Sequence, residues 1–322
     1  MLYTVLCAAA AFVVCALLLR IFIPVLRKVK LGQKILEIGP SWHKCKEGTP
    51  IMGGLFFALA ISASAVVFAV TDGKNLTGIL LILGFALLCG IIGFVDDYVK
   101  LFKKTNKGLS PLQKLVLQFM VVASFLISME TAGYLTTVIF IPFDGGSFDL
   151  GIFYYIIVAV VLVYFINGAN LTDGIDGLAG SVALVIMVFF AFASARSEAF
   201  GGSQYVCAAS AGALLAFLVF NFHPAKIFMG DTGSLYLGGL VCGMTVIFKL
   251  EFLLLLIGLV YLIEGLSVML QVAFFKRTGR RIFKMAPLHH HFEMSGWSEV
   301  KIVGVFSLVT AIACAVAYWG SM

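Results

Sequence analysis

Charged residues are scarce in this chain of 322 residues. Asp, Glu, Lys and Arg together make up 12% of it, which is about half their share in soluble globular domains. Hydrophobic residues account for 61%, and the mean hydropathy is +1.08. This composition excludes an ordinary soluble domain and indicates a polytopic membrane protein. Membrane lipid is its expected surroundings, and nucleic acid is not among its expected partners.

Several common sequence signatures are also missing. The seven cysteines are scattered and form no CxxC pair, so neither a disulfide framework nor a sulfur-ligated metal site is predicted. No GxxxxGK[ST] phosphate-binding loop occurs, which excludes a P-loop ATPase. Because no soluble segment, long linker or low-complexity tract interrupts the apolar pattern, we interpret residues 1–322 as a single membrane domain.

Long apolar runs recur along the whole chain. Runs of about 20 residues are long enough to cross a bilayer as a helix. They fall near residues 2–26, 51–70, 76–95, 112–132, 151–168, 178–195, 204–222, 234–250, 252–275 and 300–319. We therefore predict an all-α fold of about ten transmembrane helices. One loop, residues 136–151, alternates β-forming residues around Asp144-Gly145-Gly146 and predicts a small β-hairpin.

The positive charges are distributed unevenly between the loops. Loops after odd-numbered spans hold 18 of the 22 lysines and arginines. Because basic loops tend to stay on the cytoplasmic side of a membrane, these loops are predicted to face the cytoplasm. Ten spans then place both termini, and the predicted hairpin, on the extracytoplasmic side.

The polar residues of the odd-numbered loops form four motifs. GFVDDYVK (93–100) ends the third span, and NGANLTDGIDGLAG (167–180) follows the fifth. NFHPAKIFMGDTGS (221–234) follows the seventh span, and PLHHHFE (287–293) follows the ninth. All four are predicted to reach one face of the membrane, whereas the outer loops show no such clustering. Carboxylates next to hydrocarbon are costly and usually functional, so the four motifs predict one site.

Each motif also has a structural interpretation. Asp173 and Asp176 are three residues apart, and they or Asp231 could simply favour the positive N-terminal end of a helix. The run 289–291 of histidines could be a solvated surface. The two aspartates of GFVDDYVK instead continue a helix, which favours function. Glu264, inside the ninth run, is expected to be buried and functional but has no evident partner in the sequence.

The combination of carboxylates, lysines and histidines, without thiols, points to Mg²⁺. Proteins usually hold this ion with one or two carboxylates and the phosphates of a substrate. Phosphoryl transfer uses such a site, because the metal and cationic side chains stabilise charge while a carboxylate positions the nucleophile. The sequence therefore predicts Mg²⁺-dependent phosphoryl transfer at the cytoplasmic face.

The four motifs, in this order and across ten apolar runs, resemble the phospho-N-acetylmuramoyl-pentapeptide transferase family. This family is a branch of the polyprenyl-phosphate N-acetylhexosamine-1-phosphate transferase superfamily. The resemblance extends over essentially the whole chain and includes HKCKEGTPIMGG (43–54). PLHHHFE resembles the muramoyl branch in particular, since the N-acetylglucosamine-1-phosphate branch usually carries a different His-rich loop.

The resemblance implies an enzyme of the bacterial plasma membrane whose active site faces the cytoplasm. It would transfer phospho-MurNAc-pentapeptide from UDP-MurNAc-pentapeptide to undecaprenyl phosphate, forming lipid I and UMP in peptidoglycan synthesis. Direct attack by the lipid phosphate and a two-step route through an aspartyl-phosphate both remain open. A homodimer is a candidate assembly.

The resemblance also implies roles for individual residues. Asp231 would bind Mg²⁺, Asp96 would act as a base or orient the lipid phosphate, and Asp97 would support the metal and the diphosphate. The catalytic candidates also include His289, His290 and His291, at the sugar-phosphate end. The substrate-binding candidates are Lys44, Thr49, Lys100, Lys104, Asn170, Asp173, Asp176, Asn221 and Phe228. The Phe228 ring would stack on uracil.

Two other functions compete with this interpretation. A sister transferase that uses UDP-N-acetylglucosamine would share the metal, the uridine and the lipid acceptor, and PLHHHFE argues against it. A cation-coupled transporter would place ionisable groups near mid-membrane and show internal repeats. Here the aspartates of the motifs lie together at one predicted membrane face, Glu264 is the one exception among the acidic residues considered, and no internal repeat is detected.

Overall fold

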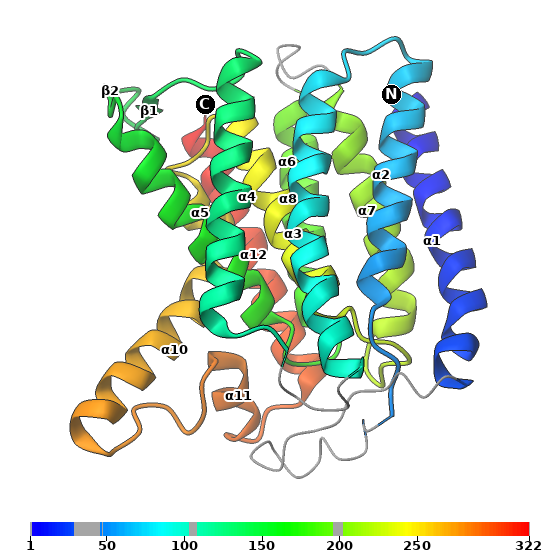
Figure 1. The fold of residues 1–322 in the computed structure, drawn as a ribbon, viewed down its shortest axis with the longest axis vertical. Coiled ribbons are helices and arrows are strands. Elements are labelled where there is room, and N and C mark those ends of the chain that lie inside the picture. The colour runs from blue at the N-terminus through cyan, green and yellow to red at the C-terminus, as the bar shows by residue number, and fades with distance from the viewer. Residues whose placement is uncertain (1, 29–45, 47, 103–107, 196–201, 322) are drawn as a thin grey trace.

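The computed structural model describes residues 2–28, 46, 48–102, 108–195 and 202–321. They form a bundle of long helices with one small β-hairpin (Figure 1). The helices are α1 (Leu2–Lys28), α2 (Gly53–Thr71), α3 (Thr77–Phe102), α4 (Pro111–Thr131), α5 (Phe153–Thr172), α6 (Leu178–Ser194), α7 (Ser203–Asn221), α8 (Gly230–Ile247), α9 (Leu254–Ile257), α10 (Leu259–Thr278), α11 (Leu288–Glu293) and α12 (Glu299–Gly320). The strands are β1 (Val138–Phe140) and β2 (Ser147–Asp149).

The predicted all-α membrane fold is confirmed. Each of the ten apolar runs contains a long helix, and eight of these helices in the described ranges are long and apolar enough to cross a membrane. The sixth and eighth runs form α6 and α8, which are 17 and 18 residues long. The ninth run is divided at Gly258 into the short α9 and the long α10.

Helix α8 lies inside the bundle and packs mainly against α3, with further contacts to α5 and α2 (Figure 1). All of its residues from 232 to 247 are buried. Because it is shielded from lipid, α8 can contain several glycines, which let neighbouring backbones approach closely. A Cβ at Gly93 of α3 would lie 2.1 Å from the carbonyl oxygen of Asp231. A Cβ at Gly54 of α2 would lie 2.1 Å from Gly233 Cα.

The β-hairpin forms at the predicted loop. Strands β1 and β2 pair antiparallel, with Val138 opposite Asp149. In Figure 1 the hairpin lies at the same end of the bundle as the beginning of α1 and the end of α12. This arrangement agrees with an even number of membrane crossings. The compartment that this end faces stays a prediction.

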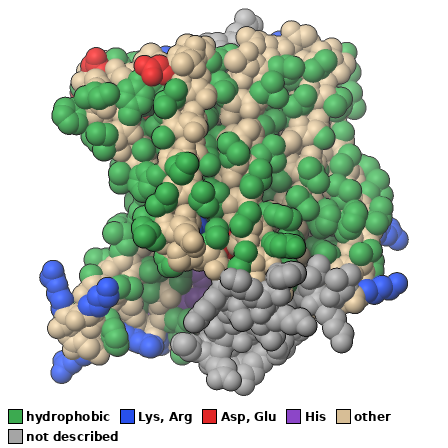
Figure 2. Space-filling model, in the orientation of Figure 1, with side chains coloured by type: hydrophobic (Ala, Val, Ile, Leu, Met, Phe, Trp, Pro, Cys, Tyr) green, Lys and Arg blue, Asp and Glu red, His purple; other side chains and the backbone are tan. Residues whose placement is uncertain are grey.

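Helix α10 slants away from the bundle at the opposite end, and α11 lies between α10 and the remaining helices (Figure 1). Large apolar side chains are exposed along the outer half of α10, at Met269, Leu270, Val272, Phe274 and Phe275. Figure 2 shows Lys and Arg side chains gathered near the tip of this arm. The last six residues of the PLHHHFE motif form α11, so this motif is not a plain loop.

Candidate active site

Asp97, near the end of α3, holds the first turn of α8. Its Oδ1 accepts a hydrogen bond from the backbone N–H of Asp231 at 3.1 Å. Its Oδ2 accepts from the N–H and the hydroxyl of Thr232, at 2.9 and 2.7 Å. The first N–H groups of a helix have no partner inside the helix, so a carboxylate here satisfies them. Gly230 permits the contact, because its φ is +71° and a Cβ would lie 2.6 Å from Asp97 Oδ2.

Asp96 points in a different direction, because consecutive residues are about 100° apart around a helix. Its Oδ1 accepts a hydrogen bond from Leu109 N at 2.7 Å, and its Oδ2 lies 2.6 Å from Lys100 Nζ. Lys114, in the first turn of α4, lies 3.9 Å from the same oxygen. Asp96 is 2% exposed and Asp97 3%, so neither is a solvated interfacial residue.

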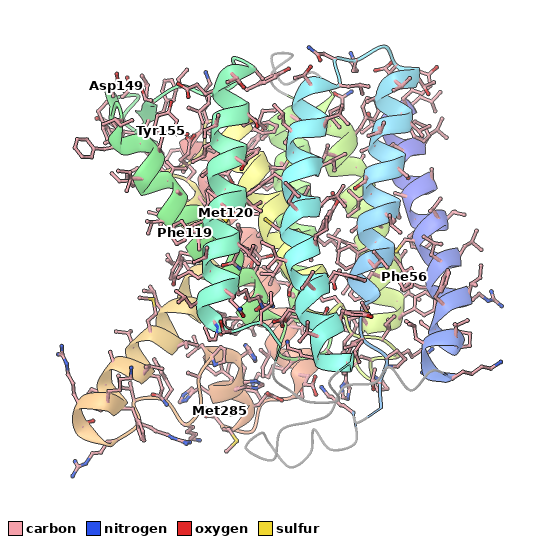
Figure 3. The ribbon with its side chains drawn as sticks, viewed as in Figure 1. Phe56, Phe119, Met120, Asp149, Tyr155 and Met285 are labelled. Atoms are coloured by element: carbon pink, nitrogen blue, oxygen red, sulfur yellow. The ribbon has the colours of Figure 1, made fainter. Side chains whose placement is uncertain are left out.

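Two lysines join Asp96 to Asp231. Lys100 Nζ lies 2.8 Å, and Lys114 Nζ 2.9 Å, from Asp231 Oδ2. Asn170, near the end of α5, donates from Nδ2 to Asp231 Oδ1 at 2.9 Å. Helices α3, α4, α5 and α8 thus converge on one charged cluster. It lies at the end of the molecule that Met285 marks in Figure 3, opposite Asp149 of the hairpin.

The carboxylate oxygens of this cluster are of the chemical kind that a hard divalent cation prefers. Asp96 and Asp231 already lie on two sides of one cation, the Lys100 ammonium group. Asp173 follows α5 beside them, and its burial together with the charges of Asp231 and neighbouring carboxylates raises the pKa of Asp173 well above its usual value. A metal ion would offset this repulsion, and Mg²⁺ prefers carboxylate and phosphate oxygens.

A second charged cluster connects the adjoining loops to α12. Lys46 Nζ lies 2.8 Å from Asp176 Oδ1 and 2.6 Å from Glu299 Oε2. His223 Nδ1 lies 3.1 Å from Asp176 Oδ2. Ligand atoms of Asp176, His223 and Glu299 lie within 4.8 Å of one another, so this group could also hold a metal ion. Lys46 already offsets part of its negative charge. Although burial opposes the charged form, hydrogen bonds to the two carboxylates raise the pKa of Lys46 above its usual value.

Asn221 and Phe228 tie the loops of the site together. Asn221 Oδ1 accepts a hydrogen bond from Gly177 N at 3.1 Å, while its amide group donates within its own loop. Phe228 is partly exposed, and its backbone is hydrogen-bonded to the segment 50–53, which directly follows Thr49. Residues from three loops therefore border the same region.

The three histidines of α11 have different surroundings. His290 Nδ1 pairs with a carboxylate of its own helix. His291 Nδ1 accepts a hydrogen bond from a backbone N–H at 3.1 Å. His289 is fully buried, and a Cβ at Gly174 would lie 2.0 Å from its Nε2. The His289 ring therefore links α11 to the loop between α5 and α6.

Most of the predicted site residues meet at this end of the bundle. The residues in the cluster, or on the loops and α11 next to it, are Thr49, Asp96, Asp97, Lys100, Asn170, Asp173, Asp176, Asn221, Phe228, Asp231, His289, His290 and His291. Lys44 and Lys104 lie outside the described residues. The sequence does not predict the contacts of Lys46, Lys114 and Glu299. A lysine in a basic loop or a glutamate at a helix start carries no distinct signal, and only its partner in space identifies it.

The fold and this site are those of a membrane-embedded transferase, and the sequence model of Glycosyl transferase family 4 matches residues 79–249. A phospho-N-acetylmuramoyl-pentapeptide-transferase of Clostridium perfringens (strain 13 / Type A) is 46% identical over 311 residues, 96% of this chain and 95% of that protein. The proteins of the same name from Clostridium botulinum (strain Eklund 17B / Type B) and Clostridium beijerinckii (strain ATCC 51743 / NCIMB 8052) are 44% and 45% identical. Each alignment covers 92% of this chain and 90% of the relative. The chain belongs to the phospho-N-acetylmuramoyl-pentapeptide-transferase family.

Proposed function

We propose that this protein transfers phospho-MurNAc-pentapeptide from UDP-MurNAc-pentapeptide to undecaprenyl phosphate, forming lipid I and releasing UMP for peptidoglycan synthesis. The observation that carries the proposal is 46% identity to a transferase of that name over 96% of the chain. The carboxylate–lysine cluster supports it, because it offers the charges that diphosphate chemistry requires. PLHHHFE favours the muramoyl donor over UDP-N-acetylglucosamine.

Lys100 and Lys114 would bind the diphosphate of the donor. Both ammonium groups contact Asp231, at 2.8 and 2.9 Å, so phosphate oxygens can replace a carboxylate oxygen as their partner. That exchange would leave the Asp231 carboxylate to a metal ion. The same two cations would then stabilise charge as UMP leaves.

We assign Asp231 as a ligand of Mg²⁺. When bound, Mg²⁺ would neutralise diphosphate charge and polarise the phosphorus for attack. Asp97 holds the backbone of Asp231 at 3.1 Å, and Asn170 holds its Oδ1 at 2.9 Å. These partners would thus orient the ligand oxygens before a metal binds. Residues that hydrogen-bond to metal ligands commonly have this effect.

Asp96 would receive the lipid phosphate. Its carboxylate is oriented by Leu109 N at 2.7 Å and has Lys100 as a charge partner at 2.6 Å. In direct attack, a lipid phosphate oxygen forms a bond to the β-phosphorus, and the bond to the UMP oxygen breaks with its electron pair. Asp96 would accept a proton from the attacking phosphate or orient it.

The proposed site faces the cytoplasm at the bacterial plasma membrane. Supporting this orientation, 18 of the 22 basic residues belong to loops at the end of the site under the ten-span topology. The homodimer stays a prediction.

Purified protein in detergent with Mg²⁺ and undecaprenyl phosphate tests the proposal. UMP and lipid I should form in equal amounts from UDP-MurNAc-pentapeptide, and omission of the lipid phosphate should stop both. UDP-N-acetylglucosamine should be a poorer donor by about 10²-fold or more in kcat/KM, because a site with polar contacts rejects substrates that lack their partners. Efficient use of UDP-N-acetylglucosamine would place the protein in the sister branch.

A further inference from the structure

Glu264 is a fully buried carboxylate of α10 that the proposed reaction does not use. Its Oε2 accepts a hydrogen bond from Leu288 N at 2.7 Å, and its Oε1 accepts from His289 N at 3.2 Å. Leu288 and His289 begin α11, and Pro287 before them supplies no side-chain cap. Because these N–H groups have no partner inside α11, the Glu264 carboxylate fastens the helix to α10.

The same carboxylate lies beside the His289 ring, with 3.3 Å between Glu264 Oε1 and His289 Nδ1. On its other side, the ring packs against Gly174, which follows Asp173. Glu264 therefore contacts both the backbone N–H and the ring of His289.

The His289 ring has an unusual polar environment. It is fully buried, and its Nε2 has no hydrogen-bond partner among the residues that the structure describes, whereas Nδ1 has the Glu264 carboxylate at 3.3 Å. His290 and His291 each have a partner for Nδ1. A buried polar group without a partner is costly, and one that persists in a folded protein calls for an explanation such as a ligand.

We propose that Glu264 is a positioning residue of the transfer reaction, holding α11 so that His289 presents Nε2 beside the 173–177 loop. The inference rests on the proposed function, because it requires a phosphate or sugar oxygen of the donor to reach this loop. A neutral imidazole can donate one hydrogen bond to such an oxygen. Glu264 does not touch the substrate, and its effect passes through His289.

Glu264→Gln is the first test. The amide keeps the size of the side chain and one acceptor oxygen. Its NH₂ group cannot accept a hydrogen bond from the second backbone N–H of α11, because both groups are donors. We expect kcat to fall by about 10²-fold, the scale of a misplacement of roughly 1 Å, while UMP affinity is kept. Glu264→Asp, which keeps the charge but cannot reach both N–H groups, should show a similar selective loss.

A double-mutant cycle separates positioning from a general structural effect. Glu264→Gln should cost little further activity in a His289→Gln background, because residues that act through one another are not additive. Additive losses in the double variant would overturn the proposal.

A labelling experiment needs no activity. Diethyl pyrocarbonate should modify His289 slowly in the wild-type protein and faster in Glu264→Gln, as measured by peptide mass spectrometry. Glu251→Gln is the matched control, since it replaces a partly buried carboxylate that accepts a hydrogen bond from the Tyr154 hydroxyl at 2.6 Å, at the far end of the bundle. The control should leave His289 protection and kcat unchanged.

The two hypotheses fail in different ways. Unchanged His289 protection in both Glu264 variants would overturn the positioning role whatever the activity. Absence of UMP release by the wild-type protein would refute the proposed function, and the labelling result would still decide whether Glu264 holds His289.

Discussion

Asp97 and Thr232 are 135 residues apart in the chain, yet Asp97 Oδ2 accepts two hydrogen bonds from Thr232, at 2.9 and 2.7 Å. This pair fastens the end of α3 to the first turn of α8. Their neighbours Asp96 and Asp231 consequently face each other across Lys100, which contacts both carboxylates. Asp97 therefore holds the start of α8 in place, whereas Asp96 and Asp231 are the carboxylates that we propose to contact the lipid phosphate and the metal ion. These roles can be tested residue by residue.

Asp231→Asn should remove nearly all turnover while the protein still folds. Loss of a group that organises charge in the transition state commonly costs about 10²-fold or more in kcat. UMP release measured against Mg²⁺ concentration checks this, with Asp149→Asn in the hairpin as a control. Near-normal activity at saturating Mg²⁺ would show that Asp231 is only part of the helix start.

Asp97→Asn should lower both stability and metal affinity. The amide can accept hydrogen bonds through one atom only, so a buried N–H or hydroxyl of α8 loses its partner, at a cost of about 1–3 kcal/mol. The Tm should fall, and the Mg²⁺ concentration for half-maximal activity should rise. An unchanged Tm would contradict the capping role.

Asp96→Asn should lower kcat and leave nucleotide affinity largely intact. If Asp96 accepts a proton from the lipid phosphate, activity should recover partly at higher pH, where more of that phosphate is already dianionic. The pH profiles of kcat for wild type and variant provide the comparison. A defect that does not change with pH would count against the role as a base.

Gly93→Ala should disrupt the site without adding any polar group. Its Cβ would lie 2.1 Å from the carbonyl oxygen of Asp231, and backbone on both sides leaves no room for adjustment. We expect loss of activity and a lower Tm. Gly84→Ala is the matched control in the same helix, because a Cβ there meets nothing within 4 Å. Equal behaviour of the two variants would refute the close approach of α3 and α8.

Lys46→Met should destabilise the protein in a pH-dependent way. The pKa of Lys46 is raised in the folded protein above the ordinary value of 10.5. Its contribution to the free energy of unfolding is therefore full below pH 10.5 and declines as the pH rises beyond that value. The Tm difference from wild type should be constant between about pH 6 and 9 and should shrink above about pH 10.5. Lys226→Met, at an exposed position, should show no comparable effect.

The amino-acid sequence by itself determines the membrane architecture. Run length and apolar composition predict the helices, because a segment is stable in a bilayer when it forms its backbone hydrogen bonds internally and exposes apolar side chains to lipid. The alternation around Asp144-Gly145-Gly146 similarly predicts the hairpin. These properties depend on residues close together in the chain. The gathering of the four motifs also follows, because the ends of alternate spans must return to the same face.

Only the tertiary structure assigns partners within that face. Asp97 and Asp96 are indistinguishable in the sequence. Packing of α8 against Gly93 makes Asp97 a cap of α8 and leaves Asp96 beside two lysines. Glu264 has no local partner, and the return of the chain at α11, 24 residues later, supplies one. Lys114 likewise gains its role from a carboxylate 117 residues away. A hydrogen bond depends on distance and direction in space, which local composition does not specify, so these roles emerge only when the helices pack.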